Sequence, residues 1–175
     1  MTAPMLYLGH GASGDARSMA PWVSHLAALG TAARAVDLPK SNPAKAQDVL
    51  RGALSEHPEA AIGGHSYGGR MASMVAADQP VRALVLLSYP LHRPGRPEEL
   101  RVEHWPRITC PVLLLSGDRD QFAQLPLLER HVAALPDHEL VIYPGQRHGL
   151  LRVIDDASAR IAAFLERHAA GAGHV

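Results

Sequence analysis

Short apolar runs alternate along the chain with stretches whose apolar residues recur at helical spacing. Runs such as 84–87 and 112–115 are apolar throughout, as expected for strands that are covered on both faces. This alternation is typical of βα units that build a parallel sheet. The pattern predicts six strands, at residues 5–8, 32–37, 60–63, 82–88, 111–116 and 139–143.

The intervals between these strands contain apolar residues three or four positions apart, which predicts amphipathic helices. One helix closes at Gly30 and the next opens at Asn42 and Pro43, since glycine favours the end of a helix and proline its first turn. The apolar faces span 19–29, 46–54, 125–135 and 154–165. The expected fold is a three-layer α/β/α sandwich with about six mostly parallel strands, forming a single domain over residues 1–175.

Composition and charge narrow the classes of function. The 17 basic and 17 acidic residues give no net charge and form no run of one sign, so electrostatic binding to nucleic acid is not expected. The single cysteine, Cys110, excludes an internal disulfide, and no apolar run approaches the roughly 18 residues of a membrane span. We expect a cytoplasmic protein that binds a small molecule, with no nucleic-acid or membrane partner; its oligomeric state stays open.

A glycine-rich turn after the third predicted strand carries the first candidate for chemistry. Residues 63–69 read Gly-Gly-His-Ser-Tyr-Gly-Gly, which contains the G-x-S-x-G pattern, and a helical face follows at 71–75. Such a turn strains the serine backbone and brings strand and helix together, so Gly64 and Gly68 must lack side chains. Ser66 is therefore a candidate nucleophile. Taken alone, the pattern also fits a turn that packs tightly or binds phosphate at a helix N-terminus.

Partners for the serine follow in the chain order acid, then histidine. Asp118 and Asp120 come directly after the fifth predicted strand, and His148 comes after the sixth. The other histidines that follow the acids lie in a predicted helix, at the wrong end of the last strand or in the tail. His148 is the predicted general base, and either aspartate could orient it.

The first predicted strand ends in a His-Gly-Ala step. Loops of this type lend a backbone N–H to an oxyanion, so Ala12 is the first predicted donor. The N–H of Tyr67, directly after the candidate nucleophile, is the second. His10 and Gly11 are expected beside the substrate, with His10 bracing the loop by hydrogen bonding rather than taking part in the chemistry.

The one long irregular segment, residues 89–109, is rich in proline and arginine. It can hold one short helix at 97–104 but no cap domain, which predicts an open, shallow site for small or exposed substrates. The segment contains His92, Arg93, Arg96 and Arg101, and it should run along the carboxyl edge of the sheet beside Ser66 and His148. A guanidinium group there could bind a carboxylate or phosphate of the substrate, and His92 and Arg93, nearest the strand end, are the predicted contacts. The alternative is a solvated loop whose charges serve solubility.

Together these landmarks resemble the α/β-hydrolase superfamily, in particular the small hydrolases akin to dienelactone hydrolase, over nearly the whole chain. The stretches 63–73, 89–95 and 117–120 also resemble bacterial proteins related to a subunit of a eukaryotic chromatin complex. In that group the acid is the last residue of the G-x-x-D step, which maps to Asp120. Dienelactone hydrolases have cysteine where this chain has Ser66, so their lactone substrate is not carried over.

The resemblance implies a minimal α/β-hydrolase fold without a cap domain. It also implies a serine hydrolase that cleaves a small ester or thioester through Ser66, His148 and Asp120, by way of an acyl-enzyme. No cofactor or metal is implied, and the eleven histidines form none of the spacings typical of metal sites. The alternative is a weakly active or inactive interaction protein, because the eukaryotic relatives serve in complexes. The presence of all three triad residue types argues against it.

Overall fold

A computed structural model of the chain describes residues 3–169. Within this range six strands form one fully parallel sheet in the order β2-β1-β3-β4-β5-β6. The strands are β1 (Leu6–Gly9), β2 (Ala33–Val36), β3 (Ala61–His65), β4 (Leu84–Leu87), β5 (Val112–Gly117) and β6 (His138–Tyr143). Each predicted strand is confirmed, with its ends displaced by a residue or two.

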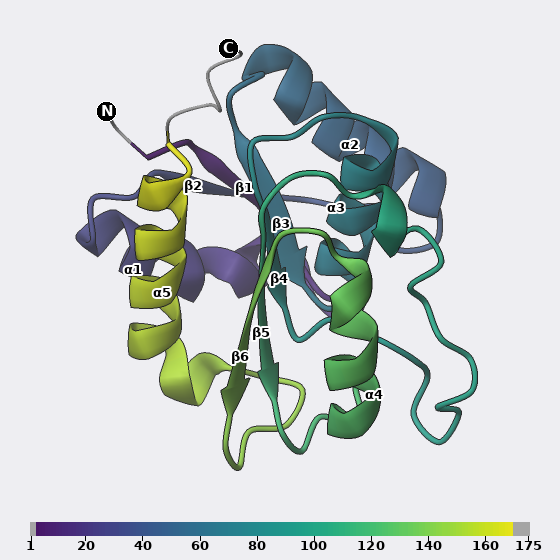
Figure 1. Cartoon of the computed structure of the whole chain (residues 1–175). Coiled ribbons are helices and arrows are strands. Elements are labelled where there is room, and N and C mark those ends of the chain that lie inside the picture. Colours follow the sequence, from purple (N-terminus) through teal and green to yellow (C-terminus); the bar gives the residue numbers. More distant parts are fainter. Residues whose placement is uncertain (1–2, 170–175) are drawn as a thin grey trace.

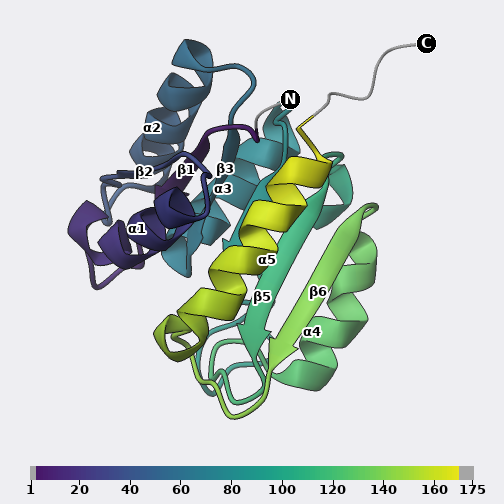
Figure 2. The same ribbon diagram turned by 90° about the vertical axis from the view of Figure 1, so that its left-hand side faces the viewer.

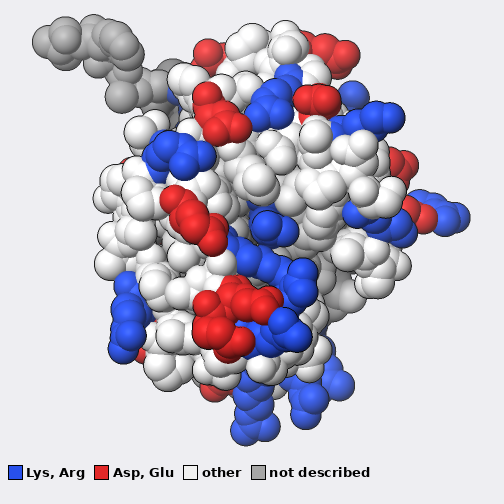
Figure 3. All heavy atoms as spheres, turned by 90° about the vertical axis from the view of Figure 1, so that its right-hand side faces the viewer, with Lys and Arg blue, Asp and Glu red and all other residues white. Residues whose placement is uncertain are grey.

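Helices cover both faces of the sheet (Figures 1 and 2). On one face lie α1 (Ala20–Ala28) and α5 (Ile154–Arg167); on the other lie α2 (Pro43–Glu56), α3 (Tyr67–Asp78) and α4 (Leu125–His131). The predicted three-layer sandwich is therefore confirmed. Among residues 3–169, no helix combines the length and the apolar composition that crossing a membrane requires. On the face shown in Figure 3, acidic and basic side chains are interspersed.

Strand β4 is apolar at every position because both of its faces are buried. Leu84 and Leu86 pack into the core beneath α2 and α3, whereas Val85 and Leu87 pack into the core beneath α1 and α5. All four side chains are fully buried. Because successive side chains of a strand point to opposite faces, a strand between two helical layers has no polar side.

Local chemistry sets the helix ends where the sequence predicted them. The side chain of Asn42 accepts a hydrogen bond from the backbone N–H of Lys45 at 3.1 Å, and Pro43 occupies the first helical position of α2. Gly30, just after α1, has φ of 77°, the left-handed conformation that glycine adopts readily. These caps satisfy backbone groups that a helix end leaves without intrahelical partners.

The strand order places a crevice between β1 and β3. From β1 the chain moves outward to β2, and it then returns across β1 to build β3 through β6 on the other side. Loops that follow β1 and β3 therefore diverge at the carboxyl edge of the sheet, where parallel α/β folds bind ligands.

At this crevice α3 begins directly after β3 and its first turn contacts β1. A Cβ added to Gly68 would collide with the backbone of Gly9, and one added to Gly64 would meet both Gly9 and Gly68. The prediction that Gly64 and Gly68 must lack side chains is thus confirmed. Ser66 between them has φ of 51° and ψ of −114°, an uncommon conformation for a residue with a side chain.

Residues 88–111, which connect β4 and β5, form a packed wall and not the loose loop that their composition suggests. The helix expected at 97–104 is wrong: these residues form turns, and a short 3-10 helix at Trp105–Arg107 follows them. The backbone N–H of Arg101 donates to Leu91 O at 2.9 Å, which folds the segment back on itself and competes with helical bonding. The Trp105 side chain is fully buried and closes the wall onto the core.

His104 ties this wall to α3. Its Nε2 and the Ser73 hydroxyl oxygen are hydrogen-bonded at 2.7 Å, and only 9% of His104 is exposed. Burial lowers the pKa of His104 to about 4.

The close approach of α3 to β1 predicts opposite effects for two helical glycines. Gly68→Ala should destabilise the protein by about 1–3 kcal/mol, because backbone must move to admit the methyl group. Gly52→Ala, in the exposed interior of α2 where a Cβ meets nothing within 4 Å, should stabilise it by roughly 0.5–1 kcal/mol. Urea unfolding of the two variants measures both values. Equal effects of the same sign would contradict the packing described.

The lowered pKa of His104 predicts a loss of stability in acid. The folded state binds a proton at His104 more weakly than the unfolded chain does. Neutral His104 therefore contributes to the free energy of unfolding above pH 6.5, and this contribution is lost as the pH falls toward 4. His104→Gln should flatten this part of the dependence of the unfolding free energy on pH, measured by urea titration. An unchanged pH dependence in His104→Gln would contradict this contribution of His104.

Candidate active site

Three side chains from different strand ends meet at the carboxyl edge of the sheet. Ser66 follows β3, Asp120 follows β5, and His148 follows β6. His148 Nε2 lies 2.8 Å from Ser66 Oγ, and His148 Nδ1 lies 2.9 Å from each carboxylate oxygen of Asp120. A carboxylate only accepts, so Nδ1 carries the proton and Nε2 is left to accept from the Ser66 hydroxyl.

Asp120 is held from two sides. Only 4% of the residue is exposed, and its Oδ1 also accepts from the backbone N–H of Phe122 at 2.8 Å. The Phe122 ring lies over the His148 ring, with 4.2 Å between their centroids. The imidazole is therefore oriented both by the carboxylate behind it and by an aromatic ring against its face.

Asp118, the other aspartate that the sequence offered as a partner of His148, makes a different contact. Its side chain is exposed and its Oδ1 accepts from the backbone N–H of Gly145 at 2.7 Å. That bond holds the loop between β6 and His148 against the end of β5. Of the two aspartates, Asp120 thus contacts the histidine and Asp118 supports the loop that carries it.

The loop after β1 borders the same site. Gly11, Ala12 and Tyr67 line a cavity of about 490 Å³ together with Ser66 and His148. Tyr67 is the first residue of α3, so its backbone N–H has no intrahelical acceptor and is free to bind a ligand atom.

His10 lies behind this loop. It is 1% exposed; its Nδ1–H donates to Gly11 O at 2.8 Å, and its Nε2 accepts from the backbone N–H of Leu38 at 2.9 Å. Both ring nitrogens are thus used to brace the loop. The structure therefore places His10 behind the loop, and His10 is not among the described residues that line the cavity.

His92 and Arg93, the other two predicted substrate contacts, lie away from this cavity. His92 is fully buried, with Nε2 accepting from Gln124 N at 3.1 Å and Nδ1–H donating to Arg93 O at 2.7 Å. The Arg93 side chain is largely exposed and lies 3.7 Å from Glu99. In the part of the chain that the structure describes, neither side chain lines the cavity. The chain turns back after Arg93, so that Arg101 reaches the site in its place.

Besides the predicted site residues, six more residues line the cavity: Ser13, His65, Arg70, Pro90, Arg101 and Phe122. A local signal existed for two of them, because His65 precedes the serine and Arg70 lies one helical turn beyond it. Arg101 belongs to the arginine-rich segment that the sequence placed beside the site, although Arg93 was the preferred contact there. Phe122 comes from a segment that folds back onto the site, and no short-range pattern marks it.

His65 positions the backbone of His148. Its Nε2–H donates to the carbonyl oxygen of His148 at 2.8 Å, and the two rings lie 5.2 Å apart. Burial lowers the pKa of His65, which keeps this ring neutral at neutral pH. A neutral ring here adds no charge beside the candidate base.

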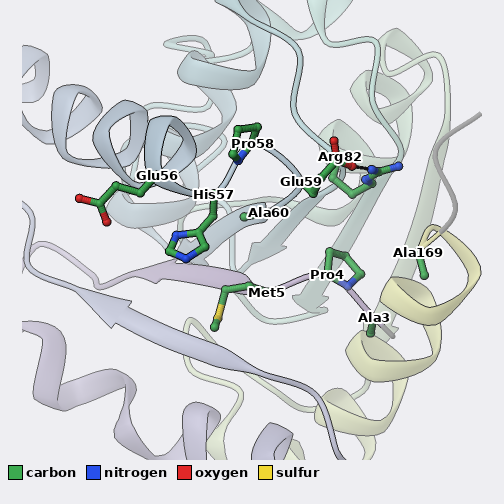
Figure 4. Close-up of a pocket in the computed structure, with 10 residues that line it drawn as sticks. All are labelled: Ala3, Pro4, Met5, Glu56, His57, Pro58, Glu59, Ala60, Arg82 and Ala169. Carbon is green, nitrogen blue, oxygen red and sulfur yellow. Dashed lines mark ion pairs between the residues drawn. The ribbon is translucent and has the colours of Figure 1, made fainter. Parts of the chain in front are cut away.

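A larger cavity, about 630 Å³, lies at the opposite edge of the sheet, where β1, β3 and β4 begin (Figure 4). Three of its polar side chains have partners: Arg82 pairs with Glu59, and His57 Nδ1 is hydrogen-bonded to the Tyr7 hydroxyl at 2.7 Å. Nothing there matches the serine, histidine and aspartate arrangement at the carboxyl edge, which is the stronger candidate for chemistry.

The chain was compared with known protein families and solved structures. A family model described as an alpha/beta hydrolase domain matches residues 33–170. Among solved structures, the chain is similar to a monoacylglycerol lipase from Paleococcus ferrophilus, at 16% identity over 96% of this chain and 97% of that chain, with a TM-score of 0.81.

Two further solved structures show how widely the fold is used. The esterase domain of a Rhodothermus marinus protein matches at 15% identity over 97% of this chain and 92% of that chain, with a TM-score of 0.75. Proline iminopeptidase from Mycobacterium smegmatis matches at 16% identity over 95% of this chain and 90% of that chain, with a TM-score of 0.72. At such identities the likeness concerns the fold alone.

Proposed function

Since this chain belongs to the alpha/beta hydrolase domain family, whose model covers residues 33–170, we propose that it is a serine hydrolase that cleaves a small ester or thioester. The observation that carries the proposal is the unbroken contact from Ser66 Oγ through the His148 ring to Asp120, at 2.8 and 2.9 Å. The likeness to a lipase and to an esterase domain supports ester cleavage. The likeness to an iminopeptidase concerns the same fold, so the choice of bond has to be tested directly.

In the proposed reaction Ser66 Oγ attacks the carbonyl carbon while His148 Nε2 takes the hydroxyl proton. An Oγ–acyl bond forms, the bond to the leaving alcohol or thiol breaks, and His148 returns the proton to that leaving group. Water then attacks the acyl-enzyme with His148 again as general base, which releases the acid and restores Ser66. Asp120 holds the imidazole in its working tautomer and stabilises the imidazolium that forms in each step.

The negative charge that develops on the carbonyl oxygen needs hydrogen-bond donors. The backbone N–H groups of Ala12 and Tyr67 are the proposed pair, since both residues border the cavity beside Ser66. His10 contributes indirectly, because its two hydrogen bonds fix the loop that carries Ala12. Removal of one such donor typically costs about 3–4 kcal/mol of transition-state stabilisation.

The shape of the site favours a compact substrate. The 88–111 segment is anchored by Trp105 and His104, and within the described residues it supplies no cap domain over the cavity of about 490 Å³. A site with one packed wall and no lid suits short or exposed acyl groups better than long chains that need a tunnel. Ser66 supplies the nucleophile, His148 acts as general base and then as general acid, and Asp120 orients His148, so the proposed reaction requires neither a metal nor a cofactor.

The nucleophile is tested by Ser66→Ala. The wild-type protein should react with a fluorophosphonate probe and hydrolyse p-nitrophenyl esters of short acyl chains, whereas Ser66→Ala should lose both activities while unfolding at the same temperature. Ser55→Ala, at an exposed serine of α2, is the matched control and should retain both. Ester turnover that survives in Ser66→Ala would contradict the proposal.

The two aspartates are distinguished by their amides. Asp120→Asn should lower kcat by about 10⁴-fold, because the amide can hold His148 in the wrong tautomer. Asp118→Asn should cost less than about tenfold, since its amide oxygen can still accept from Gly145 N. Steady-state kinetics on one ester measures both. A greater loss in Asp118→Asn would transfer the orienting role to that residue.

A further inference from the structure

Two arginines reach the cavity beside Ser66 without an acidic partner. Arg70 extends from the first turn of α3, and Arg101 extends from the 88–111 segment. In the described range, no carboxylate lies within ion-pair distance of either one. Arg93 and Arg96, on the same segment as Arg101, both pair with Glu99 and so differ from Arg101 in this respect.

The cavity offers nothing else to balance these charges. Within residues 3–169, none of the side chains that line it is acidic, and Asp120 is shielded behind His148. Nε of Arg70 is buried without a hydrogen-bond partner, which is unusual for so polar a group. Burial and the neighbouring Arg70 lower the pKa of Arg101, as expected for two cations that share one site.

Hydrogen bonds fix the backbone of both arginines. The N–H of Arg70 donates to Ser66 O at 2.9 Å, which fixes its position one turn from the nucleophile. Arg101 donates its N–H to Leu91 O at 2.9 Å, and its carbonyl oxygen accepts from the Tyr89 hydroxyl at 2.6 Å.

We propose that Arg70 and Arg101 bind an oxyanion carried by the substrate, so that the enzyme prefers esters with a negatively charged group to neutral esters of the same size. The inference rests on the proposed hydrolase function and narrows its substrate class. A guanidinium group presents parallel N–H donors that match a carboxylate or a phosphate, and the pairing strengthens where water is partly excluded. The bound anion supplies the hydrogen-bond acceptors and the charge that the protein itself does not provide there.

The test compares esters that differ only in charge. Monomethyl esters of dicarboxylic acids, from succinate to suberate, place the charge on the acyl side, and methyl alkanoates of equal length are their neutral partners. 4-Acetoxybutyrate and butyl acetate form the corresponding pair for the alcohol side. The readout is the ratio of kcat/KM for the charged ester to that for its neutral partner, followed by pH-stat titration.

The wild-type protein should favour the charged member of at least one pair. In Arg101→Gln the ratio for that pair should fall by about tenfold to a hundredfold, the range expected when a hydrogen bond to a charged group is lost. Arg96→Gln removes an arginine of the same segment that pairs with Glu99, and it should leave the ratio unchanged. Arg70→Lys, which keeps the charge but loses the paired donors, should lower the ratio by an intermediate amount.

A second measurement separates this inference from the hydrolase proposal. Calorimetry on Ser66→Ala with adipate and with inorganic phosphate detects anion binding without catalysis and shows which oxyanion is preferred. If no ester is cleaved but binding depends on Arg101, the hydrolase proposal fails and the anion site stands. If neutral esters are cleaved while neither the kcat/KM ratio nor binding depends on Arg101, the anion site alone is overturned. No cleavage and no binding would overturn both.

Discussion

The contact between the backbones of β1, β3 and α3 is the constraint on which the site depends. Gly9, Gly64 and Gly68 meet there, and a Cβ on either of the latter two would push the layers apart. Because α3 starts directly after β3, the chain can reverse only through a very sharp turn, and Ser66 at its apex takes a left-handed φ. Burial of α3 against the sheet offsets the energy of this strained conformation. Ser66 is therefore held in a position where its hydroxyl faces the cavity.

The parallel arrangement of the strands brings Asp120 and His148 close to this turn. In a sheet whose strands all run in one direction, the segments that follow β1, β3, β5 and β6 leave from the same edge. Asp120 and His148 therefore approach Ser66 although they lie far from it in sequence. Short hydrogen bonds behind them, from Phe122 N to Asp120 and from His65 to the His148 carbonyl, limit how far either group can turn.

The 88–111 segment gives the site its particular character. Its buried Trp105 and its bond from His104 to Ser73 make it a fixed wall, although its proline and arginine content resembles that of a solvated loop. Arg93 and Arg96 pair with Glu99 in this segment, and the chain then turns back so that Arg101 lines the cavity. Among residues 3–169, the side chains that line this cavity include two arginines and no acid. Such a cavity differs from an apolar lipid pocket, and its charge favours anionic ligands.

The sequence by itself determined the strands, the helix caps, and Ser66 and His148 as candidate residues, because periodicity, capping and turn chemistry act over a few neighbouring positions. It left Asp118 and Asp120 both open on residue pattern, with only a resemblance to separate them, and it assigned the substrate contact to Arg93. Those choices depend on how a strand-end turn and a long segment fold back across the sheet, through contacts such as Arg101 N to Leu91 O. Such contacts join residues whose relative position exists only once the layers are packed, so the tertiary structure alone decided which aspartate faces the histidine and which arginines face the cavity.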